Sequence, residues 1–145
     1  MTHAELEVVS EAAQLAPIRT FVRTFCRQTP GPALDEEGVD QLELAVNEAA
    51  SNIIRHAYRG LKDERLKIEA DGYPEQICVR LWYRGDPFDP DNVKPPAFDG
   101  SREGGFGVYF IAQCVDEVRY SQDSAGTNCI SLLKNRIRRP SPVPF

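Results

Sequence analysis

The sequence predicts an α+β fold, a two-layer α/β sandwich in which three helices cover one face of a mixed, largely antiparallel sheet. Two observations lead to this prediction. Apolar residues recur every three to four positions in three stretches, as in helices, and alternate with polar residues in others, as in strands. The later strands come in consecutive pairs, which favours antiparallel neighbours in the sheet.

The chain has the size of a single domain. At 145 residues it can bury about two thirds of the surface that its unfolded form exposes. We expect one folded domain over residues 1–136. A flexible tail is expected over residues 137–145, because prolines prevent a regular element from continuing there.

Charge and cysteine spacing argue against several classes of protein. A net charge of −5 and a pI near 5.1 disfavour nucleic acids and acidic membranes as partners, because phosphate binding usually needs a basic face. No apolar run approaches the length of a membrane span, and no signal region opens the chain. The four cysteines lack the close spacing of a zinc site. We therefore expect buried thiols in a reduced compartment and a cytoplasmic protein.

The first elements are a short strand and an amphipathic helix. Residues 6–9 indicate the strand, and Ser10 is the expected N-cap of a helix that runs to about Gln28. Apolar residues repeat in this helix at spacings of three and four, which predicts one buried face. The prolines and glycine of residues 29–33 end it.

The longest helix is expected from Leu34 to Tyr58, with Gly60 at its C-terminal cap. At roughly 100° per residue its apolar side chains fall within about half the circumference. These are Val39, Leu42, Ala45, Val46, Ala49, Ala50, Ile53, Ile54 and Ala57. Glu48 and Asn52 are four residues apart, so they lie one turn above the other at the rim of this stripe, where small alanines leave room for a ligand. The alternative is a solvated edge without a ligand.

Four more strands and a third helix are expected after this. Two strands cover residues 66–70 and 76–84, a third begins at residue 118, and the last covers residues 127–133. Residues 71–74 and 123–126 are the expected turns. Prolines and glycines crowd the segment 85–104, and so long a loop in a compact domain is typical of a lid or binding loop.

Glycines open the helix that follows this loop, at Gly104, Gly105 and Gly107. A helix N-terminus presents unpaired N–H groups and the positive end of a dipole, so the segment suits an anion. It is neither a dinucleotide fingerprint nor a P-loop, because no strand directly precedes it and no Gly-Lys-Ser/Thr ends it. A flexible hinge is the alternative.

Taken together, these motifs resemble a known family. NEAASNIIRHAY, at residues 47–58, resembles the N-box of the GHKL (Bergerat-fold) ATPases, and in particular of the anti-sigma factor serine/threonine kinases of the bacterial partner-switching type. RGDPFDP, GGFGVYFIAQCVDEVRY and Gly126-Thr127 resemble the family's later motifs, in the same order. The resemblance runs from Glu5 to about Arg136. It implies the histidine kinase-like ATPase fold, with ATP and Mg²⁺ as cofactors.

The resemblance implies roles for individual residues. Asn52 corresponds to the amide that holds Mg²⁺, a hard ion that prefers oxygen ligands. Glu48 corresponds to the general base, which accepts the proton of a substrate hydroxyl as it attacks the γ-phosphate. The implied nucleotide-binding residues are Asn52, Tyr83, Gly85, Arg102, Gly104, Gly105, Gly107 and Thr127. Of these, the glycines at 105 and 107 cradle the phosphates, the loop up to Gly104 forms the lid, and Arg102 reaches the γ-phosphate from it.

One residue departs from the family's pattern. Where the family has Asp-x-Gly, with the aspartate accepting a hydrogen bond from the adenine amino group, this chain has Tyr83-Arg84-Gly85. Strand alternation points Tyr83 towards the helices, where adenine would lie. Its hydroxyl can accept one hydrogen bond, its ring can stack on the base, or the ring can fill the pocket. Loss of the charge-assisted bond costs about 1.5–3 kcal/mol, or one to two decades of affinity.

The resemblance implies an anti-sigma factor kinase that binds a sigma factor and phosphorylates a serine of an anti-anti-sigma (STAS-type) protein. The alternative is a catalytically degenerate module of the same fold that switches protein partners without phosphotransfer. A weaker third interpretation is an ATP-binding domain from a histidine kinase system. The resemblance also suggests a homodimer.

Other polar residues are interpreted more simply. Glu43 and Asn47 lie on the margin of the long helix opposite Asn52, and we expect a solvated edge there. His56 is expected to pack or to form a hydrogen bond near the helix end. On the next strand, Arg80 and Trp82 point away from the helices, and the pair is a candidate anchor for a protein partner.

Overall fold

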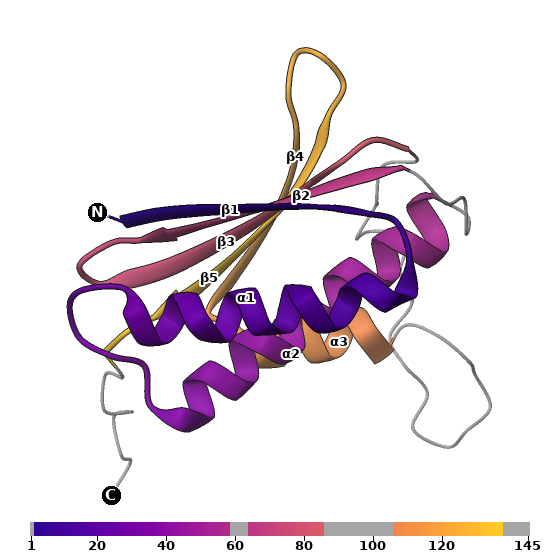
Figure 1. Cartoon of the computed structure of the whole chain (residues 1–145). Helices are drawn as coiled ribbons and strands as arrows, with labels where there is room; N and C mark the ends of the chain where they lie inside the picture. Colours follow the sequence, from indigo (N-terminus) through magenta and orange to yellow (C-terminus); the bar gives the residue numbers. More distant parts are fainter. Residues whose placement is uncertain (1, 59–63, 86–105, 138–145) are drawn as a thin grey trace, which may run out of the picture.

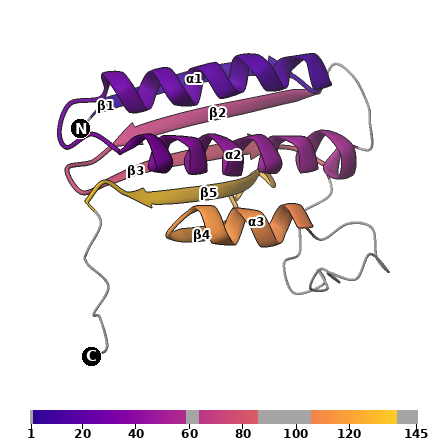
Figure 2. The same cartoon turned by 90° about the horizontal axis from the view of Figure 1, so that it is seen from below.

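The computed structural model describes residues 2–58, 64–85 and 106–137. The elements run in the order β1 Thr2–Val9, a 3₁₀ turn Ala12–Gln14, α1 Leu15–Gln28, α2 Glu36–Asn52, a π-helical turn Ile53–Ala57, β2 Arg65–Gly72, β3 Gln76–Tyr83, α3 Phe106–Cys114, β4 Glu117–Gln122 and β5 Asn128–Asn135. The three α-helices lie on one face of the sheet, with α2 between α1 and α3 (Figures 1 and 2). This arrangement confirms the α+β sandwich.

The sheet has five strands in the order β1-β2-β3-β5-β4. All four pairings between these strands are antiparallel, so the expectation of a mixed sheet is wrong for the described residues. The chain leaves β3, passes through α3 and enters the sheet at its far edge as β4. It then returns as β5, which fills the place between β4 and β3, and every neighbour therefore runs in the opposite direction.

The first helix starts differently from the prediction. Ser10 is almost fully buried, and it does not cap α1. Its N–H donates to the carbonyl oxygen of Glu64 at 2.8 Å, and its hydroxyl accepts from the Glu64 N–H at 3.2 Å. The chain then makes the 3₁₀ turn before α1 begins at Leu15. Ser10 therefore ties the end of β1 to the start of β2.

The central helix is capped as its sequence favours. Asp35 precedes α2, and its carboxylate accepts a hydrogen bond from the N–H of Gly38 at 2.7 Å. After Asn52 the helix widens into the π-helical turn, which ends where the Tyr58 N–H donates to the carbonyl oxygen of Ile53. The predicted continuity to Tyr58 is confirmed, although the last turn is not α-helical. Gly60 lies outside the described residues.

The core lies between the sheet and the helices. Leu42 and Val46 of α2 are fully buried, as are Ile68 of β2 and Leu81 of β3, and all four belong to one apolar cluster. Each such side chain contributes about 1.5–3 kcal/mol by leaving water. Packing of the apolar stripe against the sheet thus sets the position of α2. It also sets the position of Glu48 and Asn52 at the rim of the stripe.

The remaining elements lie close to their predicted positions. β2 continues through Asp71 and Gly72, where a turn is predicted, and the Tyr73 N–H then closes the hairpin on the carbonyl oxygen of Gln76. The predicted lid and, from residue 138 on, the predicted tail lie outside the described residues. Within the described part of the chain, no helix is long and apolar enough to cross a membrane.

Candidate functional site

The site predicted from sequence lies at the C-terminal end of α2. Glu48 and Asn52 are both half-buried, one turn apart on the helix. Asn52 accepts a long hydrogen bond, 3.4 Å, from the Arg55 guanidinium through its Oδ1. A carbonyl oxygen has two lone pairs, so this contact leaves capacity for a metal ion. Arg55 and His56 are exposed, so His56 does not pack near the helix end, and the alternative, a hydrogen bond there, stays a prediction.

The start of α3 lies beside this end of α2. The Lys134 ammonium group donates to Gln41 Oε1 at 2.6 Å and to the Cys114 carbonyl oxygen at 2.7 Å, which places the end of α3 near the start of α2. The helices run in opposite directions (Figure 2). At 1.5 Å per residue, α3 then extends back along α2 by about 12 Å, towards Glu48 and Asn52. Burial raises the pKa of the Cys114 thiol at the end of α3, Lys134 lowers it and Glu48 raises it.

Tyr83 is in the core at the end of β3. It is only 3% exposed, and its ring meets that of Tyr58 edge to face, with the centroids 6.4 Å apart. The Tyr58 hydroxyl donates to the carbonyl oxygen of Arg65 and accepts from the N–H of Arg84 at 2.8 Å. Tyr58 therefore joins the end of the long helical segment to the start of β2 and the end of β3. Of the three options open to Tyr83, the structure shows the ring as part of the packed interior.

Gly85 holds the turn that follows β3. Its φ is +125°, and a Cβ at this position would lie 2.6 Å from the carbonyl oxygen of Ala57. Only glycine permits both the backbone angle and the close approach. Gly85 in turn accepts a hydrogen bond from Asn128 Nδ2 at 3.1 Å, so this turn, the end of α2 and the start of β5 meet at one place.

The last strand supplies a residue that sequence reasoning missed. Asn128 is 2% exposed, lies opposite Tyr83 in the β3–β5 register, and also accepts a hydrogen bond from Gln122 Nε2. Its place directly after Thr127, next to the Gly-Thr motif, could have indicated it. Thr127 itself is half-buried, and its N–H donates to Asp123 in the preceding turn.

The structure thus brings together Glu48, Asn52, Tyr83, Gly85 and Thr127 at one end of the molecule. Gly107 lies in the first turn of α3, at the end of that helix nearer Asn52. Arg102, Gly104 and Gly105 lie outside the described residues.

Residues 8–134 match the family of histidine kinase-like ATPase domains. The chain belongs to this family. It is 30% identical over 133 residues to the serine-protein kinase RsbW of Bacillus subtilis, a match that covers 86% of this chain and 81% of that protein. A second match, to the serine-protein kinase RsbW of Oceanobacillus iheyensis, is 30% identical over 91 residues and covers 57% of this chain and 58% of that protein.

A solved structure shares the fold. The RsbU and RsbW domains of Rv1364c from Mycobacterium tuberculosis superpose with a TM-score of 0.65 over 92% of this chain and 32% of that one, at 12% identity. Within the histidine kinase-like ATPase family, the similarity is therefore to the anti-sigma factor kinases of the RsbW type, as the sequence motifs predict.

The residues fit Mg²⁺ and phosphate better than they fit adenine. Asn52 offers an amide oxygen to a hard cation, and Glu48 lies half-buried one turn away on the same helix. At the adenine end, Tyr83 replaces the carboxylate expected for this ATPase family, and its ring is buried against Tyr58. Of the predicted phosphate end, the described residues include Glu48, Asn52 and the backbone of Gly107, whereas at the predicted adenine end the expected carboxylate is replaced by the buried ring of Tyr83.

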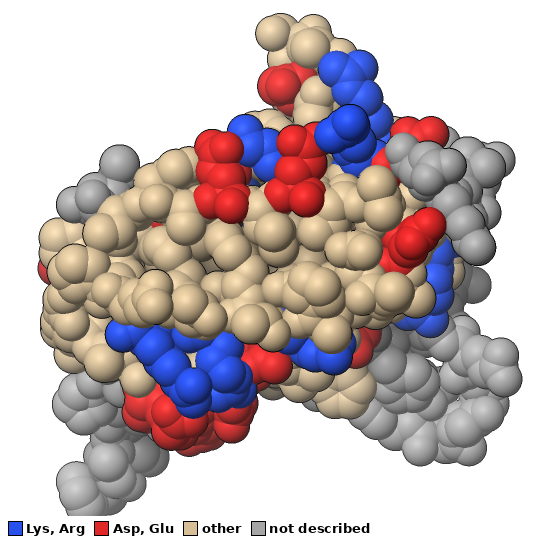
Figure 3. Space-filling view, in the orientation of Figure 1, with Lys and Arg blue, Asp and Glu red and all other residues tan. Residues whose placement is uncertain are grey.

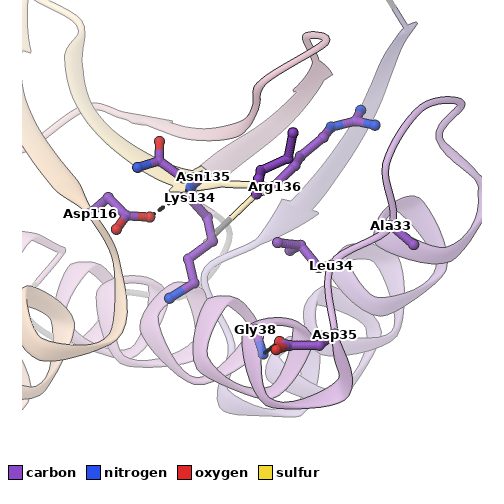
Figure 4. Close-up of a pocket in the computed structure, with 9 residues that line it drawn as sticks. Ala33, Leu34, Asp35, Gly38, Asp116, Lys134, Asn135 and Arg136 are labelled. Atoms are coloured by element: carbon purple, nitrogen blue, oxygen red, sulfur yellow. Dashed lines mark hydrogen bonds between the residues drawn. The ribbon is translucent and has the colours of Figure 1, made fainter. Parts of the chain in front are cut away.

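A pocket of about 400 Å³ lies at the other end of α2 and takes no part in this site. Figure 4 shows Asp35 and Gly38 on one side of it and Asp116 and Lys134 on the other. Its Lys134 is already bonded to Gln41 and Cys114, and the Arg136 guanidinium donates to the carbonyl oxygen of Pro30. These cations are held by the protein itself, so the pocket is not a ready phosphate site.

The margin of α2 opposite Asn52 is not a solvated edge. Arg23 of α1 contacts Glu43 through Nε at 2.7 Å and Asp40 through Nη2 at 2.6 Å. Arg19 donates to Asn47 Oδ1 at 2.8 Å. Basic and acidic side chains gather side by side where α2 emerges beneath α1 (Figure 3). The expectation for Glu43 and Asn47 is therefore wrong, because both bind α1.

The predicted anchor on the outer sheet face is held within the chain. Arg80 donates to Asp71 Oδ2 at 2.6 Å and is partly buried. Trp82 is half-buried, and its indole N–H has no acceptor among the described residues. Because this N–H is buried, a partner does not reach it in this structure, and no contact among the described residues shows Trp82 as an anchor.

Proposed function

We propose that this domain is an anti-sigma factor kinase, which binds Mg·ATP and transfers the γ-phosphoryl group to a serine or threonine hydroxyl of a partner protein. The observation that supports this most is the pair Glu48 and Asn52, half-buried and one turn apart beside the N-terminal end of α3. Family membership and the similarity to serine-protein kinases named RsbW support the same function.

Each residue of the pair has a distinct part. Asn52 would hold Mg²⁺ through its amide oxygen. Mg·ATP would supply the phosphoryl group, and the positive charge of Mg²⁺ would neutralise negative charge on the phosphates. Glu48 accepts the proton of the attacking hydroxyl, because a carboxylate one turn away faces the same side of the helix. The N–H groups at the start of α3, around Gly107, would bind the phosphates, and Gly104, Gly105 and Arg102 of the predicted lid would complete the set.

The partners follow from the family. The protein acted upon is an anti-anti-sigma factor of the STAS type, and the protein sequestered is a sigma factor. The four cysteines are free thiols in the described residues, which suits a reducing cytoplasm. A homodimer is part of the same proposal.

A second function is favoured by Tyr83. Tyr83 stands where the family has an aspartate, and its ring is buried, so the position offers no carboxylate to adenine. This substitution fits a module that binds protein partners without phosphotransfer better than it fits a kinase. Retention of Glu48 and Asn52 favours the kinase. A module without phosphotransfer has no need of a base and a metal ligand in this spacing.

Phosphoryl transfer tests the kinase directly. The purified chain is incubated with Mg²⁺ and radiolabelled ATP, together with each STAS-domain protein encoded in the same genome. Glu48→Gln is expected to lower the transfer rate by about 10²–10⁴-fold while nucleotide binding persists. Glu37→Gln, a carboxylate at the other end of the same helix, is the control and keeps the wild-type rate. If Glu48→Gln transfers phosphate at the wild-type rate, Glu48 is not part of the mechanism. If the wild-type chain transfers no phosphate, the second function is favoured.

A further inference from the structure

Three side chains of types that can bind a metal ion lie together on the outer face of the sheet, where β1 pairs with β2. His3 Nε2 lies 2.9 Å from Glu5 Oε1 and 3.8 Å from Glu69 Oε2. One ligand atom from each of the three residues lies within 4.8 Å of the others. Acidic and basic side chains interleave along this rim of the molecule, above β1 (Figure 3). The site is on the face opposite the helices, so it is separate from Glu48 and Asn52.

The ring of His3 is oriented by a buried carboxylate. Its Nδ1 lies 2.6 Å from Asp71 Oδ1, and Asp71 is only 6% exposed. Arg80 donates to the other oxygen of Asp71 at 2.6 Å, so this carboxylate is fixed on both sides. A carboxylate on one ring nitrogen of histidine, with the other nitrogen facing ligands, is the arrangement that sets the tautomer in metal sites. Here Nε2 is the nitrogen that faces the two glutamates.

The strand register brings two carboxylates face to face. Glu5 lies directly opposite Glu69 in the β1–β2 pairing, and His3 lies opposite Asp71. Like charges in directly opposed positions destabilise a sheet unless a cation lies between them. Lys67 supplies part of this charge, with its ammonium group 3.5 Å from Glu5 and 3.9 Å from Glu69. On Glu69 the contact uses Oε1, so Oε2 still faces His3, whereas Glu5 Oε1 faces both Lys67 and His3.

We propose that His3, Glu5 and Glu69 bind a divalent transition-metal ion, Zn²⁺, with Asp71 as the residue that positions His3. Tetrahedral Zn²⁺ with bonds of about 2.0–2.1 Å holds its ligand atoms about 3.3 Å apart. The two separations from His3 Nε2, 2.9 and 3.8 Å, lie on either side of this value. Water completes the fourth position, because the side chains of His3 and Glu5 are 41% and 49% exposed. The ion joins the edge strand β1 to β2.

Zinc titration of the full chain tests this proposal. The chain, freed of metal by a chelator and carrying no histidine tag, is titrated with ZnCl₂ in a calorimeter and melted with and without ZnCl₂. One Zn²⁺ per chain and a higher melting temperature are expected, since a ligand that binds only the folded form stabilises it. MgCl₂ is expected to give neither, because histidine is a poor ligand for Mg²⁺. Absence of saturable Zn²⁺ binding would overturn the proposal.

Variants locate the ion. His3→Ala and Glu69→Gln are each expected to abolish the binding, and Asp71→Asn to weaken it by about 10–100-fold. Lys67→Met, which removes the competing cation, is expected to tighten it. His56→Ala alters the other histidine of the chain, on the opposite side of the fold, and should bind as the wild type does. Loss in His3→Ala with no loss in Glu69→Gln would contradict the three-ligand site, as would loss in His56→Ala. None of these outcomes depends on the proposed kinase activity.

Discussion

The rings of Tyr58 and Tyr83 meet edge to face, with their planes at 88°. Tyr58 ends the helical segment that carries Glu48 and Asn52, and Tyr83 ends the strand that leads to the glycine turn. The contact therefore joins the helical segment that carries Glu48 and Asn52 to the end of β3, where the proposed site would hold adenine. Tyr83 is therefore a core residue, and its ring does more than occupy the position of the family's aspartate.

Tyr83→Asp is predicted to strengthen ATP binding and to weaken the fold. A carboxylate at this position restores the charge-assisted hydrogen bond to the adenine amino group, worth about 1.5–3 kcal/mol, or about ten- to a hundredfold in affinity. Loss of the buried ring costs about 3–5 kcal/mol of unfolding free energy. Tyr83→Ala removes the same ring without adding the carboxylate, and is the control. If both variants bind ATP equally, position 83 does not contact adenine.

Gly85→Ala is predicted to destabilise the domain more than Gly126→Ala does. Both glycines have positive φ, +125° and +83°, so each substitution carries backbone strain of about 1–3 kcal/mol. A Cβ at Gly85 would also lie 2.6 Å from the Ala57 carbonyl oxygen, whereas one at Gly126 would meet nothing within 4 Å. Urea unfolding of the two variants measures the difference. Equal midpoints would mean that Ala57 and Gly85 are not in close contact in solution.

Stability is predicted to fall at alkaline pH, in part through Cys26. Burial raises the pKa of the Cys26 thiol from an ordinary 9.0 to about 11. The folded form therefore holds this proton more tightly than the unfolded form does. The resulting stability is fully present below pH 9 and is lost as pH rises towards 11. Urea unfolding from pH 7 to pH 11 should show a shallower fall for Cys26→Ala than for the wild type, and parallel curves would contradict the prediction.

Local sequence patterns predicted the elements whose structure depends on local spacing. The apolar positions of the long helix are buried as expected, because a stripe with a period near 3.6 has only one way to face a core. The inner faces of β2 and β3 follow from strict alternation for the same reason. The common side of Glu48 and Asn52 also followed from the predicted helix, since residues four apart lie on the same side of it.

The incorrect predictions concern residues whose contacts are made by a distant part of the chain. The hydroxyl of Ser10 is taken by Glu64, 54 residues on, and no local signal marks that pairing. Asp71 belongs to a strand and not to a turn because it pairs with His3 of β1 and with Cys78 of β3. Glu43 is an ion-pair partner because α1 brings Arg23 against it. Motif spacing could place Tyr83 beside the site but could not decide how its ring packs.

The measurement that tests the account most directly is a calorimetric titration of the chain with ATP, in the presence of Mg²⁺ and again in EDTA. Saturable binding that weakens in EDTA, and that becomes insensitive to Mg²⁺ in Asn52→Ala, is predicted, because Asn52 is the proposed ligand of the ion. Asn47→Ala, an amide on the opposite margin of α2, should behave as the wild type does. Absence of binding at millimolar ATP would contradict the kinase and leave the module that binds protein partners without phosphotransfer.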